Sequence, residues 1–250
     1  MALDSNENNL AVALGKPGPT HIVTVTGELT NRQIEDITET AHAVEIRADM
    51  FERSDADYLI GQIGRFTVPT LFTIRTRSQG GKWRGTQTQR LELFEEVVSH
   101  VDGMDIERTA PIRSDVTDLA QQENSLLIVS NHNNKGTPLG ETLEKQLQDA
   151  RGGANWVKIV SRADTIQEFQ RQARFTMDHN DENLIVMATG QWSMASRATF
   201  WALGSDAVYS SADDIPAALG QPNYLGMGVL LDEVIPASMI SPVGRLTFKK

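Results

Sequence analysis

The sequence predicts a (β/α)8 barrel, a single domain in which eight parallel strands alternate with helices. Short apolar segments rich in β-branched residues alternate along the chain with stretches of helical periodicity. These segments begin 22 to 33 residues apart, about the length of one strand, one helix and two short connections. A length of 250 residues is also typical of such barrels.

Eight segments are predicted to be strands: 21–26, 43–47, 70–75, 103–107, 125–130, 156–160, 184–188 and 206–210. Helical patterns are clearest over 30–40, 86–100, 164–176 and 193–203. The competing architecture is an open doubly wound sheet, which usually binds nucleotides through a glycine-rich first βα turn. The first turn here, TVTGELTNRQ, has a single glycine, and this favours the barrel.

The barrel is expected to occupy the whole chain, residues 1–250, because no Pro/Gly/Ser-rich linker divides it. Residues 1–20 carry the apolar run LAVAL before GKPGP. We expect them to form a β-hairpin arm that plugs the N-terminal end of the barrel.

The composition excludes several classes of function. Thirty-three acidic against 23 basic residues give a net charge of −10, which opposes binding to nucleic acid or to an anionic membrane. No segment approaches the ~18 to 20 apolar residues of a membrane-spanning helix, and the start of the chain lacks a signal-peptide pattern, so a cytoplasmic location is expected. The lack of cysteine excludes thiolate catalysis and leaves histidine and carboxylates as metal ligands.

Charged residues gather at the predicted C-terminal ends of the strands, where barrels of this kind have their active sites. Period two places Glu45, Arg47 and Asp49 on one face, as a buried salt-bridge network, a binding site or both. The third strand ends at Arg75 before a loop with Gly80-Gly81, which suits close approach of a ligand but is also ordinary turn chemistry.

Two residues are candidates for catalysis. His132 is the only histidine at the C-terminal end of a predicted strand, either as a general acid and base or as a hydrogen-bonded structural residue. Lys158 is a lone cation in the apolar sixth strand, where burial near arginines favours a neutral amine that can form a Schiff base. The alternative is a lysine that reaches solvent or pairs with Glu45.

The segment after the seventh strand predicts an anion site. A glycine turn and a helix start at 190–197 offer backbone N–H groups, and Arg197 adds a clamp for a carboxylate or phosphate. Arg47, Arg75 and Arg197 would then surround Lys158 and His132. Such a group of cations in an acidic protein predicts a small anionic substrate that carries a carbonyl group.

These motifs resemble those of the type I 3-dehydroquinate dehydratases, the Schiff-base-forming dehydratases of the shikimate pathway, over nearly the whole chain. The order and the strand positions of the shared patterns make the combination specific. They are E-x-R-x-D at 45–49, T-x-R-T followed by G-G at 73–81, S-x-H at 130–132, K-I at 158–159, a loose form of M-x-x-x-G-x-x-S-R at 187–197, and G-Q at 220–221.

The resemblance implies a lyase that converts 3-dehydroquinate to 3-dehydroshikimate and needs no metal or dissociable cofactor. Lys158 would form an imine with the substrate ketone, and His132 would act as general acid and base. Arg197 would bind the substrate carboxylate, and further polar contacts would come from Glu45, Arg47, Arg75 and Gln221. Family members are often dimers, so a homodimer is the expected assembly.

Three departures mark the chain as a divergent member of that family. Gln79 stands where the family has a glutamate that partners the catalytic histidine, and a glutamine can orient the ring without stabilising an imidazolium by charge. Asn133 and Asn134 follow His132 in place of aspartate and phenylalanine. Ala217 replaces a serine that contacts the substrate.

Two other functions stay open on the sequence alone. Gln79 and Ala217 also fit a Schiff-base lyase or aldolase-like enzyme that acts on another small keto acid. The third function is a catalytically idle barrel that serves as a binding or regulatory module. Lys158, His132 and Arg197 argue against an idle barrel, because drift without chemistry has no reason to spare all three.

Overall fold

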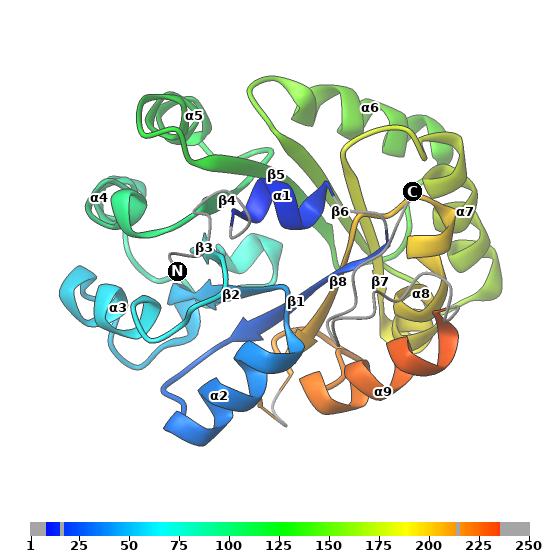
Figure 1. The fold of residues 1–250 in the computed structure, drawn as a ribbon. Helices are drawn as coiled ribbons and strands as arrows, with labels where there is room; N and C mark the ends of the chain where they lie inside the picture. The colour runs from blue at the N-terminus through cyan, green and yellow to red at the C-terminus, as the bar shows by residue number, and fades with distance from the viewer. Residues whose placement is uncertain (1–8, 16–17, 214–215, 236–250) are drawn as a thin grey trace.

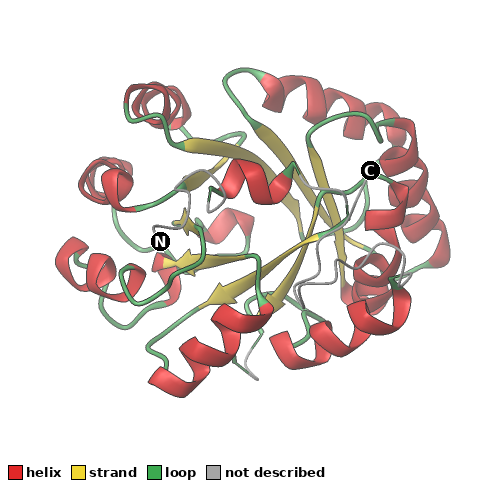
Figure 2. Cartoon of the chain, viewed as in Figure 1, coloured by secondary structure: helices red, strands yellow, loops and turns green. Residues whose placement is uncertain are grey.

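The computed structural model describes residues 9–15, 18–213 and 216–235, and these residues form the predicted barrel. Eight parallel strands make the inner wall and helices cover its outside (Figures 1 and 2). The strands are β1 Thr20–Val25, β2 Ala43–Arg47, β3 Thr70–Thr73, β4 Gly103–Glu107, β5 Leu126–Asn133, β6 Trp156–Arg162, β7 Leu184–Thr189 and β8 Ala207–Ser211. All eight match predicted segments.

Of the helices that follow the strands in the described chain, five begin at a side-chain cap. The helices are α2 Asn31–Thr40, α3 Ala56–Ile63, α4 Gln87–Val97, α5 Arg113–Gln122, α6 Gly140–Arg151, α7 Ile166–Asp178, α8 Ser193–Thr199 and α9 Tyr224–Val234. Thr30, Thr86 and Thr165 each cap a helix reciprocally with the Gln or Glu three residues later. These caps explain why three of the four clearest helical patterns begin close to their predicted positions.

Strands β5 and β6 extend by two or three residues beyond their predicted ends. The register continues through His132 opposite Val160 and through Arg162 opposite Thr189, so β5 and β6 carry polar residues within the sheet. The sequence pattern places strand ends where apolar residues stop, but ladder hydrogen bonds do not depend on side-chain polarity. As a result, His132 lies within β5 on the same face as Ser130.

The β-hairpin predicted for residues 1–20 is wrong over Leu10–Leu14, which form the helix α1. The Asn9 side chain accepts a hydrogen bond from Ala11 N–H at 2.8 Å, and helical spacing buries Leu10 and Leu14 together. Both leucines join the core inside the barrel, and α1 lies across one end of it (Figure 1). Helix α1 therefore closes the N-terminal end, as expected of the arm; residues 1–8 and 16–17 lie outside the described residues.

The wall of the barrel has a seam between β7 and β8, because the ladder runs from β7 back to β1 and on to β8 without pairing these two strands. Side chains fill the seam. Ser205 Oγ accepts a hydrogen bond from Val186 N at 2.9 Å and donates to Val186 O at 3.2 Å. Arg197 Nε donates to Tyr209 O at 2.8 Å, and Arg197 Nη1 donates to Ala188 O at 3.0 Å.

The apolar core has two main parts. The larger lies between the strands and the outer helices, and the smaller fills the barrel next to α1. The other end of the barrel interior holds polar side chains, and this division leaves the C-terminal ends of the strands free to form a site. No helix of the described chain is both long and apolar enough to cross a membrane.

Candidate active site

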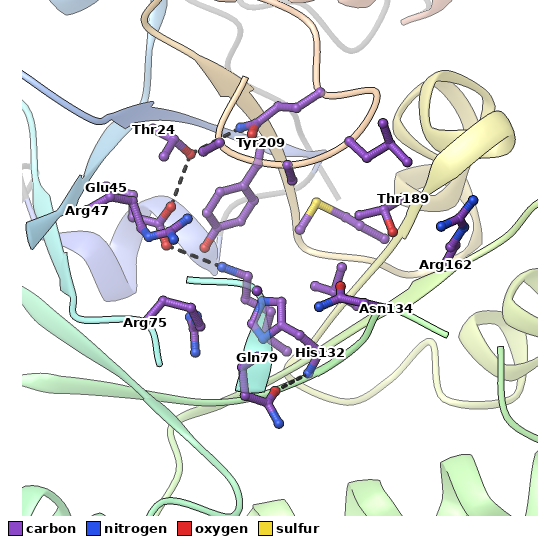
Figure 3. Close-up of a pocket in the computed structure, with 18 of the residues that line it drawn as sticks. Thr24, Glu45, Arg47, Arg75, Gln79, His132, Asn134, Arg162, Thr189 and Tyr209 are labelled. Carbon is purple, nitrogen blue, oxygen red and sulfur yellow. Dashed lines mark hydrogen bonds and ion pairs between the residues drawn. The ribbon is translucent and has the colours of Figure 1, made fainter. Parts of the chain in front are cut away.

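The C-terminal ends of the strands enclose a cavity of about 320 Å³ (Figure 3). Its lining comes from β1, β2, β5, β6, β7 and β8 and from the loops that follow the strands. The eight site residues predicted from the sequence all line it: Glu45, Arg47, Arg75, Gln79, His132, Lys158, Arg197 and Gln221. The fold thus brings together side chains that lie up to 176 residues apart in the sequence.

Lys158 is buried at the base of the cavity, with 3% of its surface exposed. Its Nζ lies 3.4 Å from Glu45 Oε1 and 3.4 Å from Asp105 Oδ2. The same atom lies 3.9 Å from the centre of the Tyr209 ring. The direct partners of the amine are therefore two carboxylates and an aromatic face. The pairing with Glu45 that the sequence left open as an alternative is present, and the amine does not reach solvent.

Glu45 organises one wall of the cavity through several hydrogen bonds. Its Oε1 accepts a bond from the Thr73 hydroxyl at 3.0 Å, and its Oε2 accepts one from Thr24 at 3.0 Å. Gln221 Nε2 in turn donates to Thr24 Oγ1 at 3.2 Å. This network orients the carboxylate toward Lys158.

Arg75 and Asp105 form a buried pair beside Lys158. Arg75 Nη2 donates to Asp105 Oδ1 at 2.7 Å, and the Ser130 hydroxyl donates to the same oxygen at 2.6 Å. Burial raises the pKa of Asp105, but Arg75 and Lys158 outweigh burial and hold that pKa well below its ordinary value. Asp105 is thus a fixed negative charge beside the amine.

The sequence reasoning missed Asp105, although the signal was present. Asp105 is a lone carboxylate in the apolar segment GMDIE, as Lys158 is a lone cation in WVKIV. The same argument, that an ionised side chain within a buried strand needs a partner, applies to both residues.

His132 lies on the inner face of β5 as a neutral imidazole. Burial, and then the positive charges of Arg75 and Lys158, hold its pKa well below 6.5. Its Nδ1 is buried without a hydrogen-bond partner among the described residues. The ring can therefore accept a proton, as a general base requires.

Gln79 does not orient that ring. Its Oε1 accepts a hydrogen bond from the backbone N–H of His132 at 2.6 Å (Figure 3). The sequence identifies the two residues as neighbours, but the contact is to the main chain. The 3-10 turn Arg77–Gln79 ends at Gly80. A Cβ on Gly81 would lie 2.1 Å from Arg75 O, so a glycine is needed where the loop passes the backbone of Arg75.

Arg197 is a buried cation with 2% of its surface exposed. Nε and Nη1 donate to backbone oxygens of Tyr209, Ala188 and Ser193, and Nη1 also donates to the Ser193 hydroxyl. Burial lowers the pKa of Arg197 to about 10, so the side chain stays charged at neutral pH. Among the described residues, Nη2 makes no hydrogen bond and no carboxylate pairs with the guanidinium.

The backbone N–H groups predicted to bind an anion beside Arg197 are already occupied. The amides of Gly190, Gln191 and Trp192 donate to Leu219 O, Asp164 Oδ1 and Ala163 O. The helix start in this segment is a 3-10 turn, Gly190–Trp192, whose amides face neighbouring loops. The Arg197 side chain, and not these amides, therefore remains the candidate anion ligand at this end of the cavity.

Arg47 and Asp49 form the salt bridge that the sequence allowed. Arg47 Nε and Nη2 donate to the two Asp49 oxygens at 2.9 and 3.0 Å. Asp49 also accepts the backbone N–H groups of Arg75 and Lys82. Asp49 thus supports the loop after β3, while Arg47 lines the cavity.

The mouth of the cavity has polar side chains on one side and a small apolar side chain in the loop after β8. Asn134, Arg162 and Thr189 line one side, and Ala217 lies in the loop after β8. Ala217 presents a methyl group there, so the position offers a ligand no hydrogen bond. Within the described ranges, no three histidine, aspartate or glutamate residues gather as metal ligands.

Proteins of known sequence resemble this chain over most of its length. The 3-dehydroquinate dehydratase of Methanococcoides burtonii is 29% identical over 184 residues, which cover 71% of this chain and 78% of that protein. The 3-dehydroquinate dehydratase of Thermodesulfovibrio yellowstonii is 29% identical over 180 residues, with coverages of 71% and 79%.

The fold agrees with that of solved structures. The 3-dehydroquinate dehydratase from Geobacillus kaustophilus superposes with a TM-score of 0.75 at 24% identity, covering 87% of this chain and 93% of that chain. A type I 3-dehydroquinate dehydratase from Clostridium difficile gives a TM-score of 0.76 at 20% identity, with coverages of 88% and 93%. The family model for Type I 3-dehydroquinase matches residues 21–232. This protein belongs to the type I 3-dehydroquinase family.

Proposed function

We propose that this protein dehydrates 3-dehydroquinate to 3-dehydroshikimate through an imine on Lys158. One observation carries the proposal beyond family membership. A single cavity presents a buried primary amine at Lys158, a neutral imidazole at His132 and, at Arg197, a guanidinium without an acidic partner among the described residues. These groups match the ketone, the acidic C–H bond and the carboxylate of that substrate.

Substrate binding begins with the carboxylate at Arg197. A buried guanidinium without a counter-ion is electrostatically costly, and an incoming carboxylate supplies the missing charge. Because Nε and Nη1 are held by backbone oxygens, Nη2 is the group that meets the substrate. Arg47 and Gln221 line the cavity near Glu45 and contribute contacts to the substrate hydroxyls.

Lys158 then attacks the ketone. Lys158 gives one proton to the neutral imidazole of His132, and the free amine nitrogen then forms a bond to the carbonyl carbon while the carbonyl π pair moves to oxygen. The oxygen takes one proton from this nitrogen and one back from His132, and it leaves as water. The resulting iminium acidifies the adjacent carbon. Glu45 and Asp105 compensate the positive charge on nitrogen, as they do in the free enzyme.

His132 completes the elimination. It takes the proton from the carbon next to the imine, and the C–H electron pair moves toward the nitrogen. The imidazolium then returns this proton to the departing hydroxyl, which leaves as water. Hydrolysis of the imine releases the product. Every step is redox-neutral, so the proposed chemistry needs no electron acceptor.

Borohydride trapping tests this proposal. Reduction during turnover of 3-dehydroquinate should leave a stable adduct on the peptide that contains Lys158. Lys158→Met should abolish the adduct and the dehydration, whereas Lys145→Met, a change on the outer helix α6, should preserve both. An adduct with a different keto acid alone would favour another Schiff-base lyase. No adduct with any keto acid would favour a binding module.

The homodimer and the cytoplasmic location expected from the sequence stay predictions. Sedimentation velocity at micromolar concentration tests the first, since a dimer doubles the mass of the 27.6 kDa chain.

A further inference from the structure

We propose that the Tyr209 hydroxyl binds the substrate by donating a hydrogen bond to the oxygen on the carbon that Lys158 attacks. This role rests on the proposed imine chemistry at Lys158. The sequence reasoning did not single out Tyr209, and the structure points to it through its position, its unpaired hydroxyl and its contact with the amine.

Tyr209 lies on β8 with its side chain inside the barrel. It lines the cavity, and 3% of its surface is exposed. Lys158 Nζ lies 3.9 Å from the centre of its ring, over the aromatic face. Figure 3 shows the ring reaching across the cavity with its hydroxyl end toward Glu45.

The Tyr209 hydroxyl has no hydrogen-bond partner among the described residues, although it is fully buried. Buried polar groups in folded proteins are nearly always hydrogen-bonded, so an orphan hydroxyl calls for an explanation. A phenylalanine would fill the same space without a polar group to satisfy. A substrate oxygen that enters the cavity would supply the missing partner.

The hydroxyl is suited to donate rather than to accept a proton. Burial, and then the negative charges of Glu45 and Asp105, raise the pKa of Tyr209 well above 10. The phenol therefore keeps its proton throughout the neutral range. Glu45 and Asp105 already accept other hydrogen bonds, from Thr73 and Ser130 among others.

The geometry places this donor beside the reacting bond. Nζ lies 3.9 Å from the centre of the ring that carries the hydroxyl, and both residues line the same cavity. An oxygen on the carbon bonded to Nζ fits between the two groups. As Lys158 attacks, the carbonyl π pair moves to this oxygen, and the Tyr209 hydrogen bond stabilises the developing negative charge while the proton stays on Tyr209.

Tyr209→Phe isolates the hydroxyl, because the ring and its contact with Lys158 remain. Tyr224→Phe is the matched control, since Tyr224 is also buried but lies on α9 outside the cavity. Loss of one such donor typically lowers turnover by about 10²-fold. We expect this loss in kcat for Tyr209→Phe and none for Tyr224→Phe. Thermal unfolding curves should show that both variants are folded.

The fraction of enzyme trapped by borohydride at saturating 3-dehydroquinate separates the proposed role from a structural one. Slower imine formation should lower the trapped fraction together with kcat, whereas damage to the later His132 step would leave it unchanged or higher. A kcat within about 3-fold of wild type, or a loss of kcat with an unchanged trapped fraction, would overturn the role of Tyr209. Absence of any adduct in the wild type would instead overturn the imine chemistry itself.

Discussion

Gln79 contacts the His132 main chain, and the ring of His132 has no acidic partner at that position. Its Oε1 accepts the His132 N–H at 2.6 Å, while Arg75 and Lys158 add positive charge nearby. A glutamate at position 79 would keep the hydrogen bond, because a carboxylate oxygen is also an acceptor. It would add the negative charge that an imidazolium needs.

We predict that Gln79→Glu raises the pKa of His132 from its depressed value. A neutral imidazole is the required base, so activity falls as the pH drops through this pKa, and the acid limb of kcat/KM should move to higher pH. Above that limb, turnover should rise by about 3-fold because the base is stronger. A pH–rate profile measures both effects.

Gln121→Glu is the control for this charge change, since Gln121 is exposed on the outer helix α5. It should leave the profile of the wild type intact. An acid limb that does not move in Gln79→Glu would show that the charge at position 79 does not reach the imidazole.

At the scale of elements, the seam between β7 and β8 replaces a strand ladder with side-chain hydrogen bonds. The Ser205 hydroxyl accepts a hydrogen bond from Val186 N and donates one to Val186 O. Arg197 donates hydrogen bonds to Tyr209 O and Ala188 O. Arg197 therefore belongs both to the wall of the barrel and to the cavity. Truncation of Arg197 would disturb stability and binding together, so Ser205 is the better probe of the seam.

Ser205→Ala should destabilise the fold by about 1 to 3 kcal/mol, because it leaves the buried Val186 N–H without an acceptor. Urea unfolding gives the free energy of unfolding. Ser161→Ala is the matched control: Ser161 is buried in β6 and its hydroxyl has no partner within the described residues. Equal losses in both variants would refute the bridging role of Ser205.

For the whole molecule, pH dependence of stability should reflect His21, which is fully buried at the start of β1. Burial, and then the nearby His42, lower the pKa of His21 from 6.5 to about 3. The fold favours the neutral ring, so His21 makes its full contribution to the free energy of unfolding above pH 6.5. This contribution is lost as the pH falls from 6.5 toward 3, because in this range the unfolded chain binds a proton that the folded chain does not.

His21→Gln should therefore flatten the acid side of the stability curve by about 1.4 kcal/mol per pH unit between pH 6 and pH 4. Denaturant unfolding at each pH measures the slope. An unchanged slope in this variant would exclude His21 as a source of acid sensitivity.

His179 provides a control of opposite sign. Burial lowers the pKa of His179, but its hydrogen bonds to the carboxylates of Glu144 and Glu182 outweigh burial and raise it. His179 makes its full contribution to the free energy of unfolding below pH 6.5, and this contribution is lost as the pH rises through the raised pKa. His179→Gln should leave the acid-side slope in place.

Much of the fold followed from local patterns along the chain. Runs such as LIVMA at 184–188 are apolar on both faces because helices cover one side and the barrel interior lies on the other, so they predict parallel strands directly. The same argument did not predict the structure of the segment LAVAL. A short apolar run fits a strand or a helix, and the Asn9 cap with the burial of Leu10 and Leu14 decided for the helix.

Residue type and strand position were enough to bring Lys158, His132 and the arginines to one end of the barrel. They were not enough to give the contacts of each side chain. Arg197 was expected to bind an anion together with backbone amides. Those amides, and two nitrogens of Arg197 itself, instead donate hydrogen bonds to other residues of the chain. Such contacts depend on the loops from Asp164 and Leu219, which lie far from Arg197 in sequence.

The sequence by itself determined the barrel, its family and most of the ionisable groups at the C-terminal ends of the strands, because hydrophobic periodicity and residue type act locally. Only the tertiary structure decided which groups are paired. Lys158 pairs with Glu45 and Asp105, whereas among the described residues Arg197 has no acidic partner and the Tyr209 hydroxyl has no hydrogen-bond partner. The physical reason is that pairing and burial depend on distances of a few ångströms between strands, which no pattern along one strand contains.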